Sequence, residues 1–246
     1  MRHAVLPQVS VARTEQSWNE VQLLKAVRAP LWRLWQYNEP ALILGRAQRR
    51  LDDGRSRSTG LETIVRTSGG GAVLAGPWML GLSVALPADH VLASRGPVDT
   101  YRWLGEGIAA SLRRCSLVAA HAVAPQSLPR APRSQDWACF GSLSPWEVAV
   151  CGRKIAGLAQ VRRRQGILLV AGVLLRASPW ELLCQALGHP ATEAMRLEAC
   201  TTDCEAQSVG AVGAHELRRA LTQCLDAKLY APRQVGQAGC ALPADI

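Results

Sequence analysis

Three short segments of the sequence combine residue types that can do chemistry. The first is Arg66–Val73, in which a serine and three successive glycines follow an arginine. Glycine tolerates positive φ and lets another group approach the backbone closely, and successive N–H groups in such a turn can hold an anion. The Arg66 guanidinium adds a planar cation suited to a phosphate or a carboxylate. A flexible hairpin loop would explain the same glycines, so this segment alone assigns no function.

The second segment is Gly152–Gln160, which begins at the base of an expected hairpin. Lys154 starts a strand whose residues at 156, 157 and 159 are small. Small residues leave room for a ligand along the strand, and an ammonium there can bind a carboxylate, a phosphate or the oxyanion that develops on a carbonyl. The competing interpretation is a solvent-exposed hairpin lysine, which is the commoner case.

The third segment contains Cys139, which is followed by an aromatic residue and two serines. It lies on an irregular connection just before the expected hairpins, where a side chain can face a cleft. A thiolate at this position would be a nucleophile, and Lys154 would help to lower its pKa. The competing interpretation is a small buried hydrophobic residue, which is the usual role of a free cysteine.

Composition places these segments in one globular domain. The chain has 246 residues, of which 48% are hydrophobic, so it can bury a real core. Its longest apolar stretches, such as Ile167–Leu175, are much shorter than the roughly 20 residues of a membrane helix. Residues 1–11 hold no apolar run of signal-peptide length. We therefore expect a single domain over residues 1–246, with a core over about 15–225, in the cytoplasm and away from membranes.

Charge and cysteine usage narrow the partners. The net charge of +9 comes almost entirely from arginine and suits an anionic cofactor or an acidic protein. The arginines are dispersed rather than interleaved with aromatic residues, which argues against nucleic acid. The eight cysteines form no C-x-x-C pair and the five histidines are scattered. We therefore expect free thiols in a reduced compartment and no protein metal site.

Hydrophobic periodicity predicts an α+β fold with a mixed, mainly antiparallel sheet packed with helices. Helices are expected at Trp18–Val27, Val98–Leu112, Trp180–Leu187 and His215–Leu229. Strands are expected at Leu31–Tyr37, Ala41–Leu44, Thr63–Arg66, Ala72–Leu74, Leu80–Leu86, Leu117–Val123, Trp146–Cys151, Lys154–Gln160 and Ile167–Leu175. Turn residues join the last three strands, so we expect them to form an antiparallel meander.

Four motifs in order resemble the lipoate–protein ligase A and octanoyltransferase family, whose catalytic fold is shared with biotin protein ligase. Leu44–Gln48 is similar to an early L-G-R-x-Q strand end, and Arg66–Val73 to an R-x-S-G-G-G-A-V signature. Gly152–Gln160 is similar to G-[RK]-K-[IV]-x-G-[ST]-A-Q, and Gly166–Leu175 to the glycine-containing strand that follows it. The order and spacing match over about residues 15–225, so the resemblance implies the biotin/lipoate protein ligase catalytic-domain fold.

The resemblance implies an enzyme that attaches lipoate or octanoate to a lysine of a lipoyl domain. In the ligase branch, ATP and a medium-chain acid form an acyl-adenylate, so ATP and lipoate are the implied cofactors, with Mg²⁺ an open addition. Lys154 would contact the adenylate phosphate and the acyl carbonyl, and the acyl chain would lie in an apolar tunnel. The positions implied for nucleotide and acyl binding are Gly45, Arg46, Arg66, Ser68, Gly69, Gly70, Gly71, Ala72, Val73, Leu74, Gly157, Ala159 and Gly172.

Cys139 adds a feature of the other branch. A Cys-Phe pair followed by S-x-x-E-V, here at residues 144–148, is typical of cysteine-dependent octanoyltransferases. Those enzymes take octanoate from octanoyl-acyl carrier protein through a thioester on the cysteine. We expect ligase chemistry first and this transfer as the alternative. The implied acceptors are lipoyl domains of 2-oxoacid dehydrogenase E2 subunits or the glycine cleavage H protein, and acyl carrier protein is a further partner for the transferase.

Two departures from the family pattern leave other functions open. Ala75–Met79 stands where the family usually has His-Asp and a Gly-Asn turn, and Ala171 stands where a histidine usually precedes the glycine of the following strand. The loss of these polar groups favours a non-catalytic member that binds an acyl group, an adenylate or a lipoyl domain without turnover. Biotin–protein ligation suits the same fold, but the glycine signature differs from the usual biotin motif.

Overall fold

A six-stranded antiparallel sheet forms the centre of the computed structural model, which describes residues 9–51, 59–93, 96–128, 136–207 and 214–230. The strand order is β1-β5-β9-β8-β7-β6. In that order the strands are Leu31–Gln36, Met79–Leu86, Gly166–Leu174, Arg153–Arg163, Val148–Val150 and His121–Ala122. Every neighbouring pair in this sheet is antiparallel, and β7, β8 and β9 form the expected meander.

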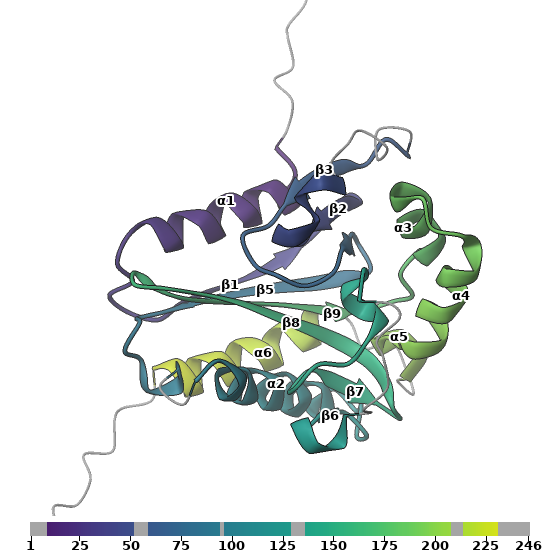
Figure 1. The fold of residues 1–246 in the computed structure, drawn as a ribbon. Coiled ribbons are helices and arrows are strands. Elements are labelled where there is room, and N and C mark those ends of the chain that lie inside the picture. The colour runs from purple at the N-terminus through teal and green to yellow at the C-terminus, as the bar shows by residue number, and fades with distance from the viewer. Residues whose placement is uncertain (1–8, 52–58, 94–95, 129–135, 208–213, 231–246) are drawn as a thin grey trace, which may run out of the picture.

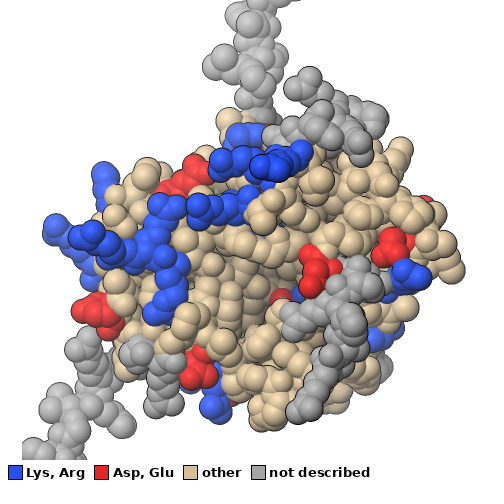
Figure 2. All heavy atoms as spheres, in the orientation of Figure 1, with Lys and Arg blue, Asp and Glu red and all other residues tan. Residues whose placement is uncertain are grey.

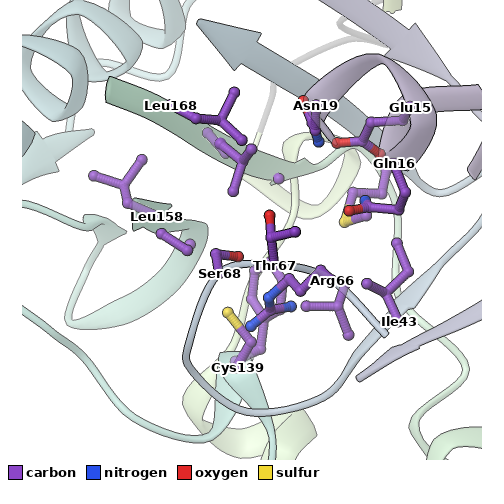
Figure 3. A pocket seen from close by; sticks show the side chains of 18 of the residues that line it. Glu15, Gln16, Asn19, Ile43, Arg66, Thr67, Ser68, Cys139, Leu158 and Leu168 are labelled. Atoms are coloured by element: carbon purple, nitrogen blue, oxygen red, sulfur yellow. The ribbon is translucent and has the colours of Figure 1, made fainter. Parts of the chain in front are cut away.

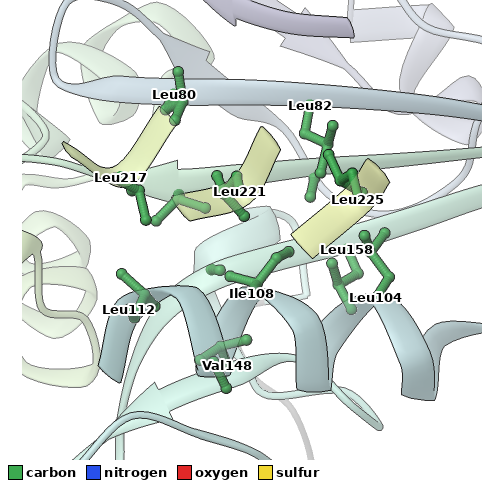
Figure 4. Close-up of a cluster of buried hydrophobic side chains, with 14 of the residues drawn as sticks. Leu80, Leu82, Leu104, Ile108, Leu112, Val148, Leu158, Leu217, Leu221 and Leu225 are labelled. Carbon is green, nitrogen blue, oxygen red and sulfur yellow. The ribbon is translucent and has the colours of Figure 1, made fainter. Parts of the chain in front are cut away.

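Helices cover both faces of the large sheet (Figure 1). Helices α2 (Pro97–Arg114) and α6 (Ala214–Leu229) pack together on one face, and α1 (Val11–Leu24) lies on the other. Leucines and isoleucines from α2 and α6 meet those of the central strands in the main core (Figure 4). Because both faces are covered, all eight residues of β5 are buried. This explains why β5 is a nearly continuous apolar run.

A three-stranded sheet lies next to α1 and forms a second core with it. Its order is β3-β2-β4, with strands Glu62–Val65, Ala41–Leu44 and Val73–Ala75. Strand β2 is parallel to β3 and antiparallel to β4. The predicted mixed, mainly antiparallel sheet is therefore confirmed. The turn after β1 carries the chain from the large sheet into the small one, so the glycine-rich segment between β3 and β4 lies beside the large sheet.

Three helices lie beside the edge of the large sheet at which β8 begins (Figure 1). Helices α3 (Trp180–Leu187), α4 (Ala191–Cys200) and α5 (Cys204–Gln207) follow β9. The segment after α4 joins the start of β8, because the Thr202 N–H donates to the Lys154 carbonyl at 2.9 Å. Helix α3 matches its predicted range, whereas α4 and α5 were not predicted from the sequence.

Two predicted elements were wrong in extent. The helix expected at Trp18–Val27 begins at Val11, where Ser10 accepts the Arg13 N–H, and it ends at Leu24. Its first two turns were missed because the side chains that they bury include Glu15, so no apolar stripe marks them. The strand expected at Leu117–Val123 is only the two-residue β6, because turns occupy residues 115–119 and leave Val118 exposed without sheet pairing.

The remaining elements follow the predictions closely. The other two predicted helices form as α2 and α6, and the short strands β2, β3 and β4 lie within one residue of their predicted ranges. The strand predicted from Trp146 begins two residues later, and β8 extends three residues beyond Gln160. Among the described residues, none of the helices combines the length and apolarity that a bilayer crossing needs.

Candidate active site

Lys154 is buried at the start of β8, and its ammonium has three protein acceptors. Its exposed fraction is 1%. The Nζ atom lies 2.6 Å from Oε2 of Glu147, and it donates to the carbonyls of Cys139 at 2.5 Å and Ser142 at 2.9 Å. An ammonium has three N–H groups, so all three are used. The structure excludes the solvent-exposed hairpin lysine and makes Lys154 the anchor of the segment that carries Cys139.

Glu147, just before β7, is the counter-ion of this lysine and is also buried. Its Oε1 accepts the Leu158 N–H at 3.1 Å, and its Oε2 accepts the Ser144 N–H at 2.7 Å as well as the Lys154 ammonium. Three donors thus converge on one carboxylate, as a buried charge requires. The sequence analysis noted this glutamate only as part of a motif. The signal that could have found it is a carboxylate that begins an apolar strand and faces Lys154 across the β7–β8 hairpin.

Cys139 is held by hydrogen bonds of its main chain to two other segments. Its N–H donates to the Ala72 carbonyl at 2.8 Å, and the Ala72 N–H donates to the Trp137 carbonyl at 2.7 Å. Its own carbonyl accepts the Lys154 ammonium. The thiol is half-buried and lines the cavity described below. The backbone of this cysteine is therefore fixed, while its sulfur atom faces open space.

A row of three glycines on neighbouring strands makes space for the thiol. Gly157 on β8 pairs with Gly172 on β9, which pairs in turn with Gly81 on β5. A Cβ at position 157 would lie 3.1 Å from the Cys139 sulfur. Side chains from elsewhere cover the other two positions, namely the Met79 thioether over Gly172 and the Tyr37 hydroxyl over Gly81. Any larger residue at position 157 would displace the thiol.

The glycine-rich loop is organised from within by Arg66. Gly70 takes a φ of 95°, which favours glycine. The Arg66 guanidinium is buried, and its Nη2 donates to the carbonyls of Gly69 and Gly71 at 2.8 Å each. Its Nη1 makes no hydrogen bond to another described residue, so part of this cation remains available to an anion. The prediction that Arg66 and the loop bind phosphate is not tested by these contacts.

Two further glycines serve close backbone packing rather than ligand approach. A Cβ at Gly71 would lie 2.7 Å from the Cys139 N atom, and a Cβ at Gly45 would collide with the Gly70 carbonyl. These glycines let three chain segments meet. The glycine signature and the early Gly-Arg motif therefore help to place the cysteine.

A cavity extends from the Cys139 thiol between α1 and the sheet (Figure 3). Including its open mouth, it encloses about 560 Å³. The sheet side is apolar and the α1 side is polar. Apolar lining residues include Met79, Leu158, Ala159, Leu168, Val170 and Gly172, and polar ones are Glu15, Gln16, Asn19, Tyr37, Arg66, Thr67 and Ser68. A cavity therefore lies where the apolar tunnel was predicted, near Gly157 and Gly172, but one of its walls is polar, and its use as an acyl tunnel stays a prediction.

Glu15 is the most unusual group in that wall. Its exposed fraction is 4%. Its carboxylate accepts hydrogen bonds from the Tyr37 hydroxyl at 2.6 Å, the Ser83 hydroxyl at 3.5 Å and the Asn19 side chain. Burial raises the pKa of Glu15 to about 7, although these hydrogen bonds and the charge of Arg66 act in the opposite direction. Glu15 and Gln16 were not found from the sequence because they lie on the helix turns that were not predicted, whereas Asn19 lies within the predicted helix.

The structure brings many of the predicted site residues together and separates others. Lys154, Cys139 and Gly157 are in contact, and Arg66, Ser68, Val73, Ala159 and Gly172 line the same cavity. Gly69 and Gly70 line a second cavity, which shares Leu158 and Ala159 with the first and includes Glu147. Gly45, Gly71, Ala72 and Leu74 pack the loop and the core, and the side chain of Arg46 is exposed. No cluster of three His, Cys, Asp or Glu side chains suited to a metal occurs in the described part of the chain.

Comparison with known proteins connects this geometry to one enzyme family. A curated relative, octanoyltransferase LipM of Geobacillus kaustophilus, is 32% identical over 65% of this chain and 59% of its own length. The chain thus spans about three fifths of that relative. One structural neighbour is lipoate-protein ligase A bound with ATP, with a TM-score of 0.65 and 20% identity over 89% of this chain and 81% of that chain. A second is a bi-partite lipoate protein ligase studied with its E2 lipoyl domain from Thermoplasma acidophilum, with the same TM-score and identity over 89% of this chain and 79% of that chain.

These findings confirm the predicted fold and the predicted family. The match to the family covers residues 8–220, which include the sheet, the glycine-rich loop, Cys139 and Lys154. The chain belongs to the lipoyl protein ligase A/B catalytic-domain family.

Proposed function

We propose that the chain transfers a medium-chain acyl group, octanoyl in the first instance, to a lysine of a lipoyl domain through a thioester on Cys139. The observation that carries this proposal is the position of the thiol. It lines a cavity with an apolar wall, on a backbone fixed by the buried Lys154–Glu147 pair. The octanoyltransferase relatives support it.

The reaction has two acyl transfers. The Cys139 thiolate attacks the thioester carbonyl of the donor, the bond from that carbon to the carrier's sulfur breaks, and the carrier leaves as a thiol after taking up a proton. The lysine amine of the acceptor then attacks the Cys139 thioester. An amide forms, the amine loses a proton and the Cys139 thiol is restored. No nucleotide is consumed in either step.

Lys154 serves this reaction first by positioning. In the present arrangement it holds the Cys139 and Ser142 carbonyls, so contact with a substrate oxyanion would require one of these hydrogen bonds to exchange. Glu147 restricts the ammonium in turn. Lys154 therefore positions the backbone of the nucleophile Cys139. The predicted direct contact between Lys154 and the acyl carbonyl would form only in the transition state of the proposed reaction.

The charge of the surface suits acidic protein partners. Lys and Arg side chains gather over one end of the face in Figure 2, beside α1 and the β8–β9 turn, where Arg162, Arg163 and Arg164 are exposed. Complementary charge steers association and weakens with salt. The proposed partners are a lipoyl domain of an E2 subunit or of the glycine cleavage H protein as acceptor, and acyl carrier protein as donor.

A second candidate is ligation through an acyl-adenylate, which was the first expectation from the sequence. The observation in its favour is the available Nη1 of Arg66, beside a loop whose Gly69 and Gly70 line the second cavity. A neighbouring fold was solved with ATP bound. An adenylate phosphate, like the oxyanion of the first route, would have to replace one of the three acceptors of the Lys154 ammonium. ATP, lipoate and Mg²⁺ would be its co-substrates and ion.

The experiment that separates the two routes uses an apo lipoyl domain as acceptor. The chain is incubated with octanoyl-acyl carrier protein without ATP, and in parallel with lipoate, ATP and Mg²⁺. Intact mass of the acceptor reports the product. We expect acylation in the first reaction only, and its loss in the Cys139→Ser variant. Acylation that requires ATP and survives Cys139→Ser would establish the ligase, and no product in either reaction would favour the non-catalytic alternative.

A further inference from the structure

The α1 wall of the cavity holds polar side-chain atoms that lack hydrogen-bond partners among the described residues. Asn19 has an exposed fraction of 1%, and its Oδ1 has no partner. Gln16 has an exposed fraction of 8%, and its side chain makes no hydrogen bond within the described part of the chain. Both line the cavity beside Glu15 (Figure 3). A buried polar group without a partner is destabilising by about 1–3 kcal/mol, so a wall of this kind calls for a polar ligand.

The wall lies beyond the thiol along the expected path of the chain. The Cys139 sulfur lies over the row of paired residues that contains Gly157 and Gly81. Ser83, whose hydroxyl donates a hydrogen bond to Glu15, is two residues after Gly81 and lies in the next row on the same face of the sheet. That row is about 7 Å further on, because two strand residues separate the rows. Asn19 is one helical turn beyond Glu15. An acyl chain attached to Cys139 would therefore meet the polar wall with its distal carbons and not with its carbonyl.

The opposite wall explains why the ligand still needs a hydrocarbon chain. Ala159, Leu168 and Val170 of β8 and β9 present only apolar atoms to the same cavity. A saturated chain would satisfy this sheet side but leave Asn19 and Gln16 without partners. A free sugar or nucleotide would lose its hydration against this apolar sheet side without gaining a hydrogen bond there. The cavity is thus complementary to a chain that is apolar on one side and carries a hydrogen-bond donor on the other.

We infer that the preferred acyl group carries a hydroxyl on its distal half, and that Asn19 and Gln16 recognise it. This inference deepens the proposed function and rests on it for the attachment of the chain to Cys139. The hydroxyl donates to the Oδ1 of Asn19, while Gln16 can donate or accept. Burial raises the pKa of Glu15 to about 7, so near neutral pH a large fraction of this carboxyl is uncharged and compatible with an acyl ligand.

The test measures binding of free acids, so it does not depend on catalysis. Calorimetric affinities are compared for 8-hydroxyoctanoate, 6-hydroxyoctanoate and nonanoate, the last of which replaces the terminal hydroxyl of the first by a methyl group. For the wild-type chain we expect the better hydroxy acid to bind about tenfold more tightly than nonanoate, as one additional buried hydrogen bond allows. Asn19→Leu and Gln16→Leu should each reduce or reverse this ratio, and Gln22→Leu, on the same helix outside the cavity wall, should leave it unchanged.

Each result decides the question. Nonanoate binding as tightly as both hydroxy acids, or no binding of any acid, would overturn the inference, as would an unchanged ratio in both cavity variants. Thermal unfolding checks that each variant is folded. The comparison of the three acids in the wild-type chain does not depend on the variants. Preferential binding of a hydroxy acid by a chain that forms no thioester on Cys139 would refute the proposed function and retain this specificity.

Discussion

Replacing Lys154 by Met should destabilise the chain strongly, because it leaves the Glu147 carboxylate buried without its counter-ion. Breaking a buried ion pair in this way lowers the free energy of unfolding by about 3–5 kcal/mol. Glu147 keeps its two backbone donors, from Leu158 and Ser144, which places the expected value at the lower end. For a chain of this size the melting temperature should fall by roughly 6–20 °C.

A second substitution separates stability from activity. Glu147→Gln in the Lys154→Met background removes the uncompensated charge, and the amide oxygen still accepts one of the two N–H groups. One N–H then lacks an acceptor, which is destabilising by about 1–3 kcal/mol. The double variant should therefore be more stable than Lys154→Met alone by up to about 2 kcal/mol, yet remain inactive, because nothing holds the Cys139 carbonyl.

Urea unfolding followed by tryptophan fluorescence gives the free energies, and mass of an acceptor lipoyl domain gives the transfer rate. The matched control is Lys228→Met, which removes an exposed lysine from α6 and should change neither quantity. A Lys154→Met variant as stable as the wild type, or a double variant that transfers acyl groups normally, would refute the assignment of this pair.

Three further results are expected. Gly70→Val should abolish ligand binding, measured with a non-hydrolysable acyl-adenylate mimic and an acyl thioester analogue, because a β-branched residue disfavours a φ of 95°. The control is Gly60→Val, which also replaces a glycine of positive φ, at 69°, but lines neither cavity. Gly157→Ala should slow alkylation of Cys139 by iodoacetamide several-fold, and an unchanged rate would contradict the placement of the thiol. Relative to Glu15→Gln, the wild type should lose roughly 3 kcal/mol of unfolding free energy between pH 4.5 and 7. Burial raises the pKa of Glu15 from 4.5 to about 7, so the folded chain retains a proton that the unfolded chain releases. Unfolding free energies of the two chains that change in parallel with pH would contradict this prediction.

The elements marked by apolar periodicity could be predicted from the sequence. The β7–β9 meander, α2 and α6 have clear patterns and turn residues, and four motifs in order, from Leu44–Gln48 to Gly166–Leu175, were enough to identify the family. The start of α1 could not be found in this way, because it buries Glu15 and Gln16 where a helix usually buries leucines. The same polarity that concealed the helix forms the cavity wall.

Contacts that depend on strand register also escaped prediction. The row of Gly81, Gly157 and Gly172 exists only because β5, β9 and β8 pair in one particular alignment. Likewise, the sequence indicated a cation at Lys154 but not that its three N–H groups are occupied. Local pattern therefore identified the residues of the site, whereas their roles depended on the long-range arrangement of the backbone.

The most direct test of the proposed reaction is the mass of the chain itself after brief incubation with octanoyl-acyl carrier protein and no acceptor. The account predicts the gain of one octanoyl group, its removal by hydroxylamine, its location on the peptide that contains Cys139, and its absence from Cys139→Ser. Because a hydroxyl ionises far less readily than a thiol, the serine variant should not replace the thioester by an ester. An unmodified chain that nevertheless acylates a lipoyl domain, or an adduct on another residue, would contradict the central claim.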